Sequence, residues 1–409
     1  MSRRSAWLIS SIAGIVAVAV AATLPATGQS VPGVSSTQVI LGSVHPYSGA
    51  LSAYSAVGKG CKAYFDYVND QGGVAGRKIV FLDRDDAYNP PQSLQLVKQL
   101  VEQDHVFAIF NSLGTPPNTV LRPYLNENKV PQLWISTGAT KWVTEADKYP
   151  WTTMALLDYQ DESVIYAKYL LKNSPNAKIG VLYQNDDYGQ DYLTGLQKGL
   201  GTKSNLIVKT VSYEVMDPDV SSQIASLKSA GADTVFVFAT PKFSSQALVA
   251  IGKLSWKPAI YLNSVSNSQV TMKAATANGG PGVTNGVISV LYIKDPSDAA
   301  MANDPGMQLY KQIMAKYLSG SDPNDGFYMA GMDYAYMMVD TLKKAGKNLT
   351  RDTIMTAALH LHETDNPFLL PGVVVQTSPE DRFPVRDAHL IRYDDGKWSQ
   401  FGTMLTARH

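Results

Sequence analysis

The chain has 409 residues, which is long for one compact domain and comfortable for two. Apolar residues make up 45% and charged residues 17%, so the composition predicts a folded globular protein and excludes intrinsic disorder. Lys+Arg and Asp+Glu both number 35, and this balance gives no electrostatic footprint for binding to nucleic acid or to an anionic membrane surface.

The N-terminus has the three parts of a secretory signal peptide. Two arginines form a short basic start, residues 6–24 are apolar and free of charge, and Pro25 is followed by small residues. This pattern predicts a signal peptide over residues 1–28 that is cleaved after Gly28. An uncleaved membrane anchor is the alternative, because the apolar run approaches the length that spans a bilayer.

Cys61 is the only cysteine, so no disulfide can form within the chain. A bacterial lipid anchor requires a cysteine just after the signal peptide, and none stands there. We therefore expect an exported, soluble, monomeric periplasmic protein whose fold depends on core burial alone. Cys61 lies within a helical pattern, which favours a buried small apolar residue over a nucleophile.

Strands and helices alternate from residue 39 onward. The expected strands of the first half are 39–44, 78–82, 106–110 and 133–136, and the expected helices are 53–69, 90–101 and one that opens at Thr115. The pattern repeats with strands 178–182, 206–213, 234–239 and 259–262, and helices 188–200, 220–230 and 243–254. A strand at 286–293, helices at 304–318, 327–345 and 350–360, and a β-ribbon over 372–401 follow. This order predicts an α/β fold with two Rossmann-like lobes, each built on a parallel sheet.

No catalytic motif is visible. The six histidines lie in no nucleophile–base context, and the patterns G-x-S-x-G, H-E-x-x-H and the P-loop are absent. Asp83, Asp85 and Asp86 cluster at a strand end and suggest a magnesium or enzyme site, but acids there also cap the following turn. We therefore expect no enzyme, no cofactor and no metal.

Two loops at strand ends are rich in glycine and small hydroxyl residues. They are residues 111–115, which lead into a helix, and residues 136–140. Ligands of open α/β sheets bind at the carboxyl ends of the strands, and amides at a helix start attract anions. The two loops together predict a cradle for a ligand carboxylate, while each alone is also ordinary loop chemistry. Tyr54 and Tyr188 follow strands at the same level and offer apolar faces with one hydroxyl each.

After the signal peptide, the sequence resembles the leucine/isoleucine/valine-binding family of ABC-importer solute receptors. The resemblance is carried by Pro46-Tyr47-Ser48-Gly49 and by residues 69–77 (NDQGGVAGR), 85–90 (DDAYNP), 136–140 (STGAT) and 187–190 (DYGQ). It implies a type I periplasmic binding fold, in which three crossovers join two lobes and the ligand binds between them. Lobe one is then expected at residues 38–156 plus 287–362, and lobe two at residues 157–286 plus 363–409.

The resemblance also implies roles for individual residues. Tyr54 corresponds to an aromatic wall, and Tyr188 to the aromatic of lobe two that closes over the ligand. Gly138 and Thr140 match backbone and side-chain ligands. Gly114 falls where the family has a carboxylate-binding serine, and the threonine beside it offers a hydroxyl. The expected ligand-binding residues are Tyr54, Leu113, Gly114, Thr115, Gly138, Ala139, Thr140, Tyr188, Thr240 and Ser264.

One departure from the family bears on the ligand. In its amino-acid binders an acid after a late strand of lobe two holds the ligand ammonium, and Ser264 stands about where that acid belongs. An ammonium buried without a carboxylate is costly. We therefore expect a small carboxylate-bearing solute, aromatic or otherwise lacking an α-amine, that is captured by hinge closure and passed to the membrane permease subunits of an ABC importer.

Other functions stay open at this point. A branched-chain or other amino acid would bind if another acid replaced the missing one. A ligand-sensing receptor would use the same hinge closure to signal rather than to import. A two-lobed α/β enzyme would place its site at the cluster of Asp83, Asp85 and Asp86. Of all partners, a small-molecule ligand and a permease are expected, and nucleic acid is not.

Overall fold

The computed structural model of the protein describes residues 31–406. The signal peptide expected over residues 1–28 lies outside these residues. Within them, no helix is both long enough and apolar enough to cross a membrane.

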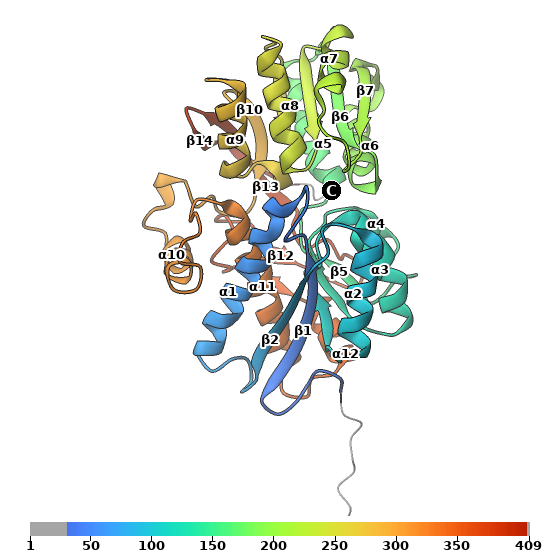
Figure 1. Cartoon of the computed structure of the whole chain (residues 1–409), viewed down its shortest axis with the longest axis vertical. Helices are drawn as coiled ribbons and strands as arrows, with labels where there is room; N and C mark the ends of the chain where they lie inside the picture. The colour runs from blue at the N-terminus through green and yellow to red at the C-terminus, as the bar shows by residue number, and fades with distance from the viewer. Residues whose placement is uncertain (1–30, 407–409) are drawn as a thin grey trace, which may run out of the picture. The chain divides into compact units, whose positions relative to one another are not determined.

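The first sheet consists of five parallel strands in the order β2-β1-β3-β4-β5 (Figure 1). They are β1 (Gln38–His45), β2 (Lys78–Asp85), β3 (Ala108–Phe110), β4 (Gln132–Ile135) and β5 (Thr152–Met154). Every residue of β3 and β4 is buried, as in central strands of a parallel sheet covered on both faces. The helices between these strands are α1 (Ser55–Asp70), α2 (Pro90–Glu102), α3 (Thr115–Glu127) and α4 (Lys141–Thr144).

The second sheet has seven strands in the order β14-β13-β10-β9-β8-β6-β7. Five of them run parallel, namely β6 (Ile179–Gln184), β7 (Ile207–Tyr213), β8 (Thr234–Phe238), β9 (Ala259–Leu262) and β10 (Val287–Leu291). The strands β13 (Asp387–Asp394) and β14 (Lys397–Thr406) extend this sheet in antiparallel pairing. Its helices are α5 (Tyr159–Asn173), α6 (Asp187–Leu200), α7 (Ser221–Ser229), α8 (Pro241–Lys253) and α9 (Gln269–Gly279). The predicted α/β fold with two Rossmann-like lobes is confirmed.

Two of the expected lobe boundaries are wrong. β10 was expected in lobe one, but it pairs with β9 and β13 and so belongs to the second sheet. Residues after β11 (His362–Glu363) were expected in lobe two, but Phe368 packs against Tyr64 of α1, with ring centroids 5.6 Å apart. Lobe one therefore contains the first sheet, α10 (Pro305–Tyr317), α11 (Gly326–Ala345), α12 (Arg351–Ala358), β11 and β12 (Val375–Gln376). Lobe two contains the second sheet and α5 to α9.

The chain passes between the lobes three times, after β5, after β10 and after β12. The second passage is hydrogen-bonded to a segment of lobe one. The amide of Lys294 donates to the carbonyl of Phe368 over 2.8 Å, and the amide of Leu370 donates to the carbonyl of Tyr292 over 2.9 Å. This pairing fixes the backbone of residues 292–294 beside the cavity described below.

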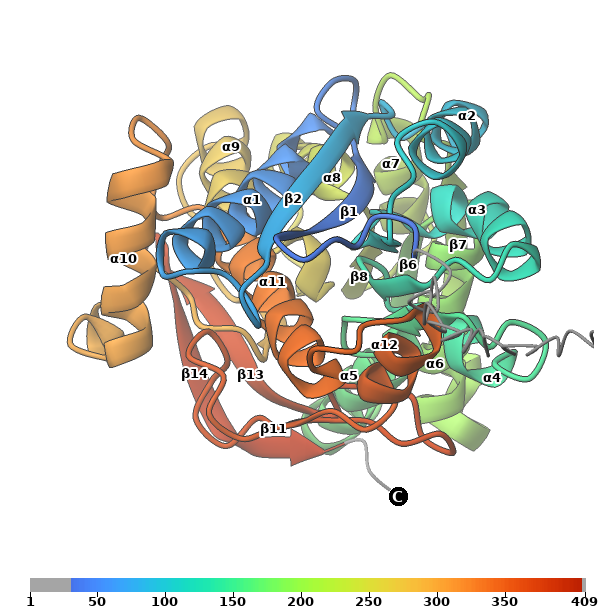
Figure 2. The same ribbon diagram turned by 90° about the horizontal axis from the view of Figure 1, so that it is seen from below.

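The helices α1 and α11 lie side by side in close contact (Figure 2). A Cβ atom added at Gly331 would lie 2.1 Å from the carbonyl oxygen of Val57, so only glycine allows this approach. Cys61 is fully buried in the same contact, and its thiol lies 3.2 Å from the carbonyl oxygen of Gly331. The expected burial of this cysteine is confirmed, and burial raises the pKa of its thiol well above the usual value, which disfavours the reactive thiolate.

Candidate functional site

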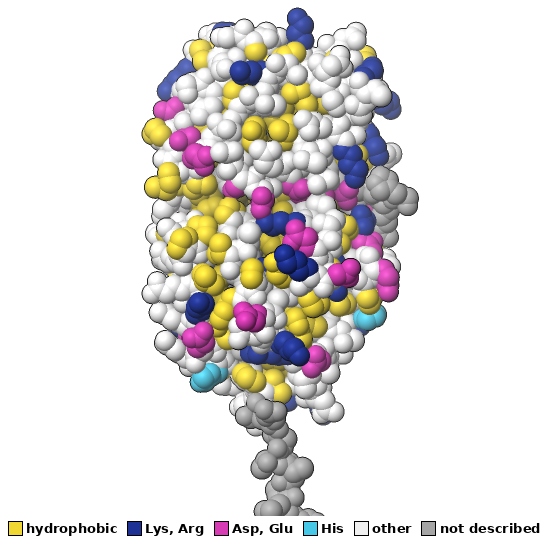
Figure 3. Space-filling model, turned by 90° about the vertical axis from the view of Figure 1, so that its right-hand side faces the viewer, with side chains coloured by type: hydrophobic (Ala, Val, Ile, Leu, Met, Phe, Trp, Pro, Cys, Tyr) yellow, Lys and Arg dark blue, Asp and Glu magenta, His cyan; other side chains and the backbone are white. Residues whose placement is uncertain are grey.

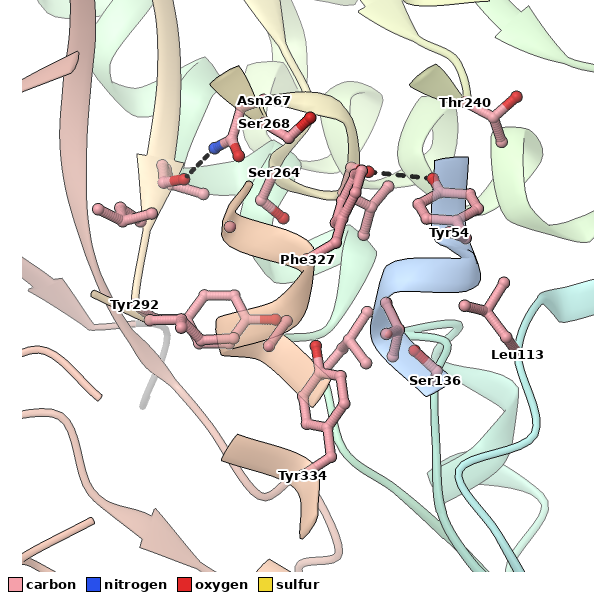
Figure 4. A pocket seen from close by; sticks show the side chains of 18 of the residues that line it. Tyr54, Leu113, Ser136, Thr240, Ser264, Asn267, Ser268, Tyr292, Phe327 and Tyr334 are labelled. Atoms are coloured by element: carbon pink, nitrogen blue, oxygen red, sulfur yellow. Dashed lines mark hydrogen bonds between the residues drawn. The ribbon is translucent and has the colours of Figure 1, made fainter. Parts of the chain in front are cut away.

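A cavity of about 990 Å³, partly open to solvent, lies between residues of the two lobes. Its wall is mostly aromatic and aliphatic, with single hydroxyl and amide groups between the rings (Figure 4). This composition is typical of sites for small organic molecules, which are largely apolar and hold a few polar groups that fix orientation. The aromatic residues of the wall are Tyr54, Tyr88, Tyr159, Tyr188, Tyr292, Phe327, Tyr334 and Trp398.

Tyr54 joins the two lobes at this wall. It ends the short 3-10 helix Ser52–Tyr54 that precedes α1, and its ring packs edge-on against Phe327 at 5.1 Å between centroids. Its hydroxyl donates to the carbonyl of Val265 in lobe two over 3.0 Å (Figure 4). One side chain thus closes the cavity on the lobe-one side and contacts the backbone of lobe two.

The structure brings seven of the ten expected residues to the wall of this cavity. They are Tyr54, Leu113, Gly114, Thr115, Tyr188, Thr240 and Ser264. Gly114 has a positive φ of 99°, and a Cβ there would lie 2.3 Å from the ring of Tyr88. The loop therefore needs glycine because the Tyr88 ring occupies the space above it.

Gly138, Ala139 and Thr140 do not line this cavity. The hydroxyl of Thr140 donates to Asp158 over 2.7 Å, and its amide donates to Asp191 over 2.8 Å. Because Asp191 belongs to α6, Thr140 connects lobe one to lobe two instead of offering its donors to a solute. Burial, and then the neighbouring charge of Asp191, raise the pKa of Asp158 to about 7.

The expected anion cradle at the start of α3 is also poorer than predicted. Pro116 and Pro117 occupy the first turn and carry no amide hydrogen. The amide of Gly114 already donates to the carbonyl of Ser136 over 3.1 Å, and the hydroxyls of Thr115 and Thr137 pair with each other at 2.6 Å. The prediction of a cradle built from both loops is therefore wrong, because most of its donors already bind other groups of the protein.

Ser264 is held by the buried carboxyl group of Glu162, which was not predicted from the sequence. The amide of Ser264 donates to Glu162 Oε1 over 2.7 Å, and its hydroxyl lies 2.6 Å from Glu162 Oε2. The hydroxyls of Tyr166 and Tyr192 also contact this carboxyl group, at 2.8 and 2.9 Å. Burial raises the pKa of Glu162, and the hydrogen bonds from Ser264, Tyr166 and Tyr192 oppose that rise.

The second passage between the lobes contributes wall residues that were not predicted. Residues 292–295 line the cavity and include the only ionic side chains of its described wall, Lys294 and Asp295. The Lys294 ammonium pairs with Asp304 at 2.6 Å, and Asp295 accepts hydrogen bonds from Ser297. Each of these charges therefore has a partner within the protein. Residues 292–295 reach the cavity wall because the backbone of residues 292–294 pairs with lobe one. No local sequence motif indicates that pairing.

The carboxylates of Asp83, Asp85 and Asp86, which were considered as an enzyme or magnesium site, face hydrogen-bond donors of the protein. Asp83 contacts His45 at 2.9 Å and accepts from the hydroxyl of Tyr47 at 2.6 Å, and Asp85 accepts from the amide of Tyr47. Asp86 accepts from the amide of Tyr88, which supports the capping interpretation of this cluster. Within residues 31–406, no group of three or more His, Cys, Asp or Glu side chains is arranged to hold a metal ion. On the face drawn in Figure 3, basic and acidic side chains are mixed, so neither sign dominates it.

Comparison with known proteins identifies the class to which this fold and site belong. The sequence model of a family described as periplasmic binding protein matches residues 38–397, and the chain belongs to that family. An "Amino acid binding protein" of Pseudomonas aeruginosa is 23% identical over 81% of this chain and 83% of its own length. A "Leu/Ile/Val-binding protein homolog 1" of Brucella abortus is 31% identical over 48% of this chain and 53% of its own length.

Solved structures of proteins that are described with different ligands show the same fold. A fatty acid ABC transporter substrate-binding protein from Thermomonospora curvata has a TM-score of 0.77 at 19% identity, covering 92% of this chain and 95% of its own. A branched chain amino acid ABC transporter from Thermus thermophilus with bound valine has a TM-score of 0.80 at 16% identity, covering 91% and 97%. A solute binding protein of R. palustris in complex with benzoate has a TM-score of 0.74 at 19% identity, covering 89% and 96%.

Proposed function

We propose that this protein is the solute-binding component of an ABC importer and captures a small carboxylate-bearing solute with an apolar body that lacks an α-amine. The observation that carries the proposal is the wall of the cavity between the lobes, which is aromatic and aliphatic. Of its two charged side chains, Lys294 is ion-paired with Asp304 and Asp295 accepts hydrogen bonds from Ser297. Membership of the periplasmic binding protein family supports export to the periplasm and delivery to membrane permease subunits.

The absence of an amine from the solute follows from the carboxyl groups around the cavity. A solute ammonium would need a carboxylate in direct contact, because burying it without one costs several kcal/mol. Glu162 already accepts hydrogen bonds from Ser264, Tyr166 and Tyr192, and Asp295 accepts them from Ser297. The described wall has no unpaired cation either, so the solute carboxylate would be held by hydroxyl donors of the wall, such as Ser136, while its aromatic or aliphatic body packs against the rings. Benzoate, which a structural neighbour binds, is a probe of this kind.

Hinge closure is the mechanism that the contacts between the lobes favour. Tyr54 reaches Val265 on one side of the cavity, and Thr140 reaches Asp191 on another. A solute that touches both lobes favours the closed arrangement, because only contacts that differ between open and closed states shift their populations. The permease would then recognise the closed, loaded protein.

Thermal-shift measurements on protein purified from the periplasm test this function. The probes are benzoate, a medium-chain fatty acid, a short dicarboxylate, valine and leucine. We expect the monocarboxylates without an amine to raise the melting temperature, since a solute at a hundred times its Kd stabilises the folded state by about 2.7 kcal/mol. Shifts with valine or leucine alone would contradict the proposed solute. Chemical conversion of any probe by the protein would contradict the import function itself.

A further inference from the structure

The contact between Ser264 and Glu162 determines which hydrogen-bonding group the solute presents to lobe two. Ser264 begins a short 3-10 helix, Ser264–Ser266, directly after β9, and lies on the cavity wall (Figure 4). Glu162 comes from α5 and is fully buried behind it. The solute can therefore touch the Ser264 hydroxyl, while the carboxyl group that holds this hydroxyl stays out of reach.

The direction of the hydrogen bond between the two side chains follows from their chemistry. A serine hydroxyl has one hydrogen and two lone pairs, and an ionised carboxylate can only accept. Glu162 Oε1 must accept, because the backbone amide of Ser264 can only donate to it. At Oε2 the hydroxyls of Ser264 and Tyr192 converge at 2.6 and 2.9 Å, while the Ser264 amide and the Tyr166 hydroxyl face Oε1. Four donors around one carboxyl group favour its charged form, and in that form both hydroxyls at Oε2 donate to it.

The hydrogen of Ser264 is thus directed away from the cavity, and its lone pairs are left toward the solute. We propose that Ser264, held by Glu162, is a specificity-determining hydrogen-bond acceptor, so that the solute carries a hydroxyl or amide N–H donor at its lobe-two end. A second carboxylate or a carbonyl oxygen at that end would meet an acceptor and be rejected. This inference rests on the proposed function and adds to it the polarity of one end of the solute.

Paired probes that differ in one donor test this inference. We would measure the Kd of the 2-, 3- and 4-hydroxybenzoates and of the matching fluorobenzoates by titration calorimetry, with benzoate as the reference. We expect at least one hydroxy isomer to bind about tenfold more tightly than its fluoro partner, which is the effect of one hydrogen bond to a polarised acceptor. Ser264→Ala should bring that pair to within about twofold.

Glu162→Gln reverses the hydrogen bond without removing it. The amide of Ser264 holds the carboxamide oxygen at the Oε1 position, so the new NH₂ group faces the Ser264 hydroxyl and donates to it. The serine hydrogen then points to the solute, and the preference for the hydroxy isomer should fall to about threefold or less. Ser222→Ala, at an exposed position of α7 outside the cavity, is the control and should leave both Kd values and their ratio unchanged.

The outcomes separate this inference from the proposed function. If benzoate binds but every hydroxy–fluoro pair binds alike, the acceptor role is overturned while the importer function stands. If a preference exists and survives Ser264→Ala, the acceptor lies elsewhere and the inference is equally overturned. If Glu162→Gln fails to fold, the result with Ser264→Ala decides alone. If neither benzoate nor any derivative binds, the proposed solute class falls, and the inference falls with it.

Discussion

Glu363→Gln should make the protein more stable at alkaline pH. Glu363 ends β11 with 1% of its surface exposed, and its Oε1 atom has no hydrogen-bond partner among residues 31–406. Asn366 donates to its Oε2 over 2.9 Å and to Asp333 over 2.8 Å. Burial, followed by the charges of Asp333, Asp340 and Asp365, raises the pKa of Glu363 from 4.5 to about 9.

The sign of the effect follows from proton uptake. Between pH 4.5 and about 9 the folded protein keeps a proton on Glu363 that the unfolded chain has lost, so folding becomes weaker as the pH rises. One proton changes the free energy of unfolding by about 1.4 kcal/mol per pH unit, or by about 2 to 3 kcal/mol between pH 6 and pH 8. The contribution is complete below pH 4.5 and is lost on approach to pH 9. Glutamine binds no proton, so the variant escapes this loss.

Urea unfolding of the solute-free protein at pH 6, 7 and 8 measures this difference. We expect the free energy of unfolding of Glu363→Gln, relative to the natural protein, to rise by about 2 to 3 kcal/mol across this range. Glu127→Gln, at the exposed end of α3, is the matched control and should follow the natural protein. Parallel profiles for Glu363→Gln and the natural protein would show that the buried carboxyl does not hold its proton, and would refute the reasoning. Asp333 has its own pKa of about 8, so both proteins keep some pH dependence.

Two further substitutions test the packing and the closure. Tyr54→Phe removes the hydrogen bond to Val265 but keeps the ring. It should weaken binding of whichever probe solute binds by about 3- to 10-fold, with little change in the melting temperature of the solute-free protein. An unchanged Kd would show that this contact does not favour the closed state. Gly331→Ala places a Cβ 2.1 Å from the carbonyl oxygen of Val57 and should lower the free energy of unfolding by about 1 to 3 kcal/mol in urea titration, and an unchanged midpoint would contradict the close contact of α1 and α11.

The order of strands and helices was predictable because local patterns carry it. Asn89 accepts a hydrogen bond from the amide of Gln92 and caps α2, with proline at the first position, as its sequence predicts. Helix α5 was not predicted, since its buried residues include Asp161, Glu162 and Ser163 and its apolar face is interrupted. The sheet that receives β10 was also beyond prediction, because strand pairing over long range depends on the path between the lobes and not on the strand itself.

In the candidate site, too, residues marked by local patterns were predicted, and contacts between distant parts of the chain were not. Residues that follow strand ends, such as Tyr54 and Tyr188, were found because the carboxyl edge of a parallel sheet is a general location for ligands. Pro116 and Pro117 were visible in the sequence and already indicated a helix start with few amide donors. The partners of Thr140 could not be read from the sequence, because Asp191 reaches it from the other lobe.

The single thiol of this protein gives a practical route to watching the lobes move. Because Cys61 is inaccessible and its thiolate is disfavoured, maleimide reagents should pass it by in the folded state. Cysteines introduced at exposed positions, one on each lobe, would then carry a donor and an acceptor fluorophore, and the native Cys61 would not have to be replaced first. The distance between the dyes would report the approach of the lobes as solute is added.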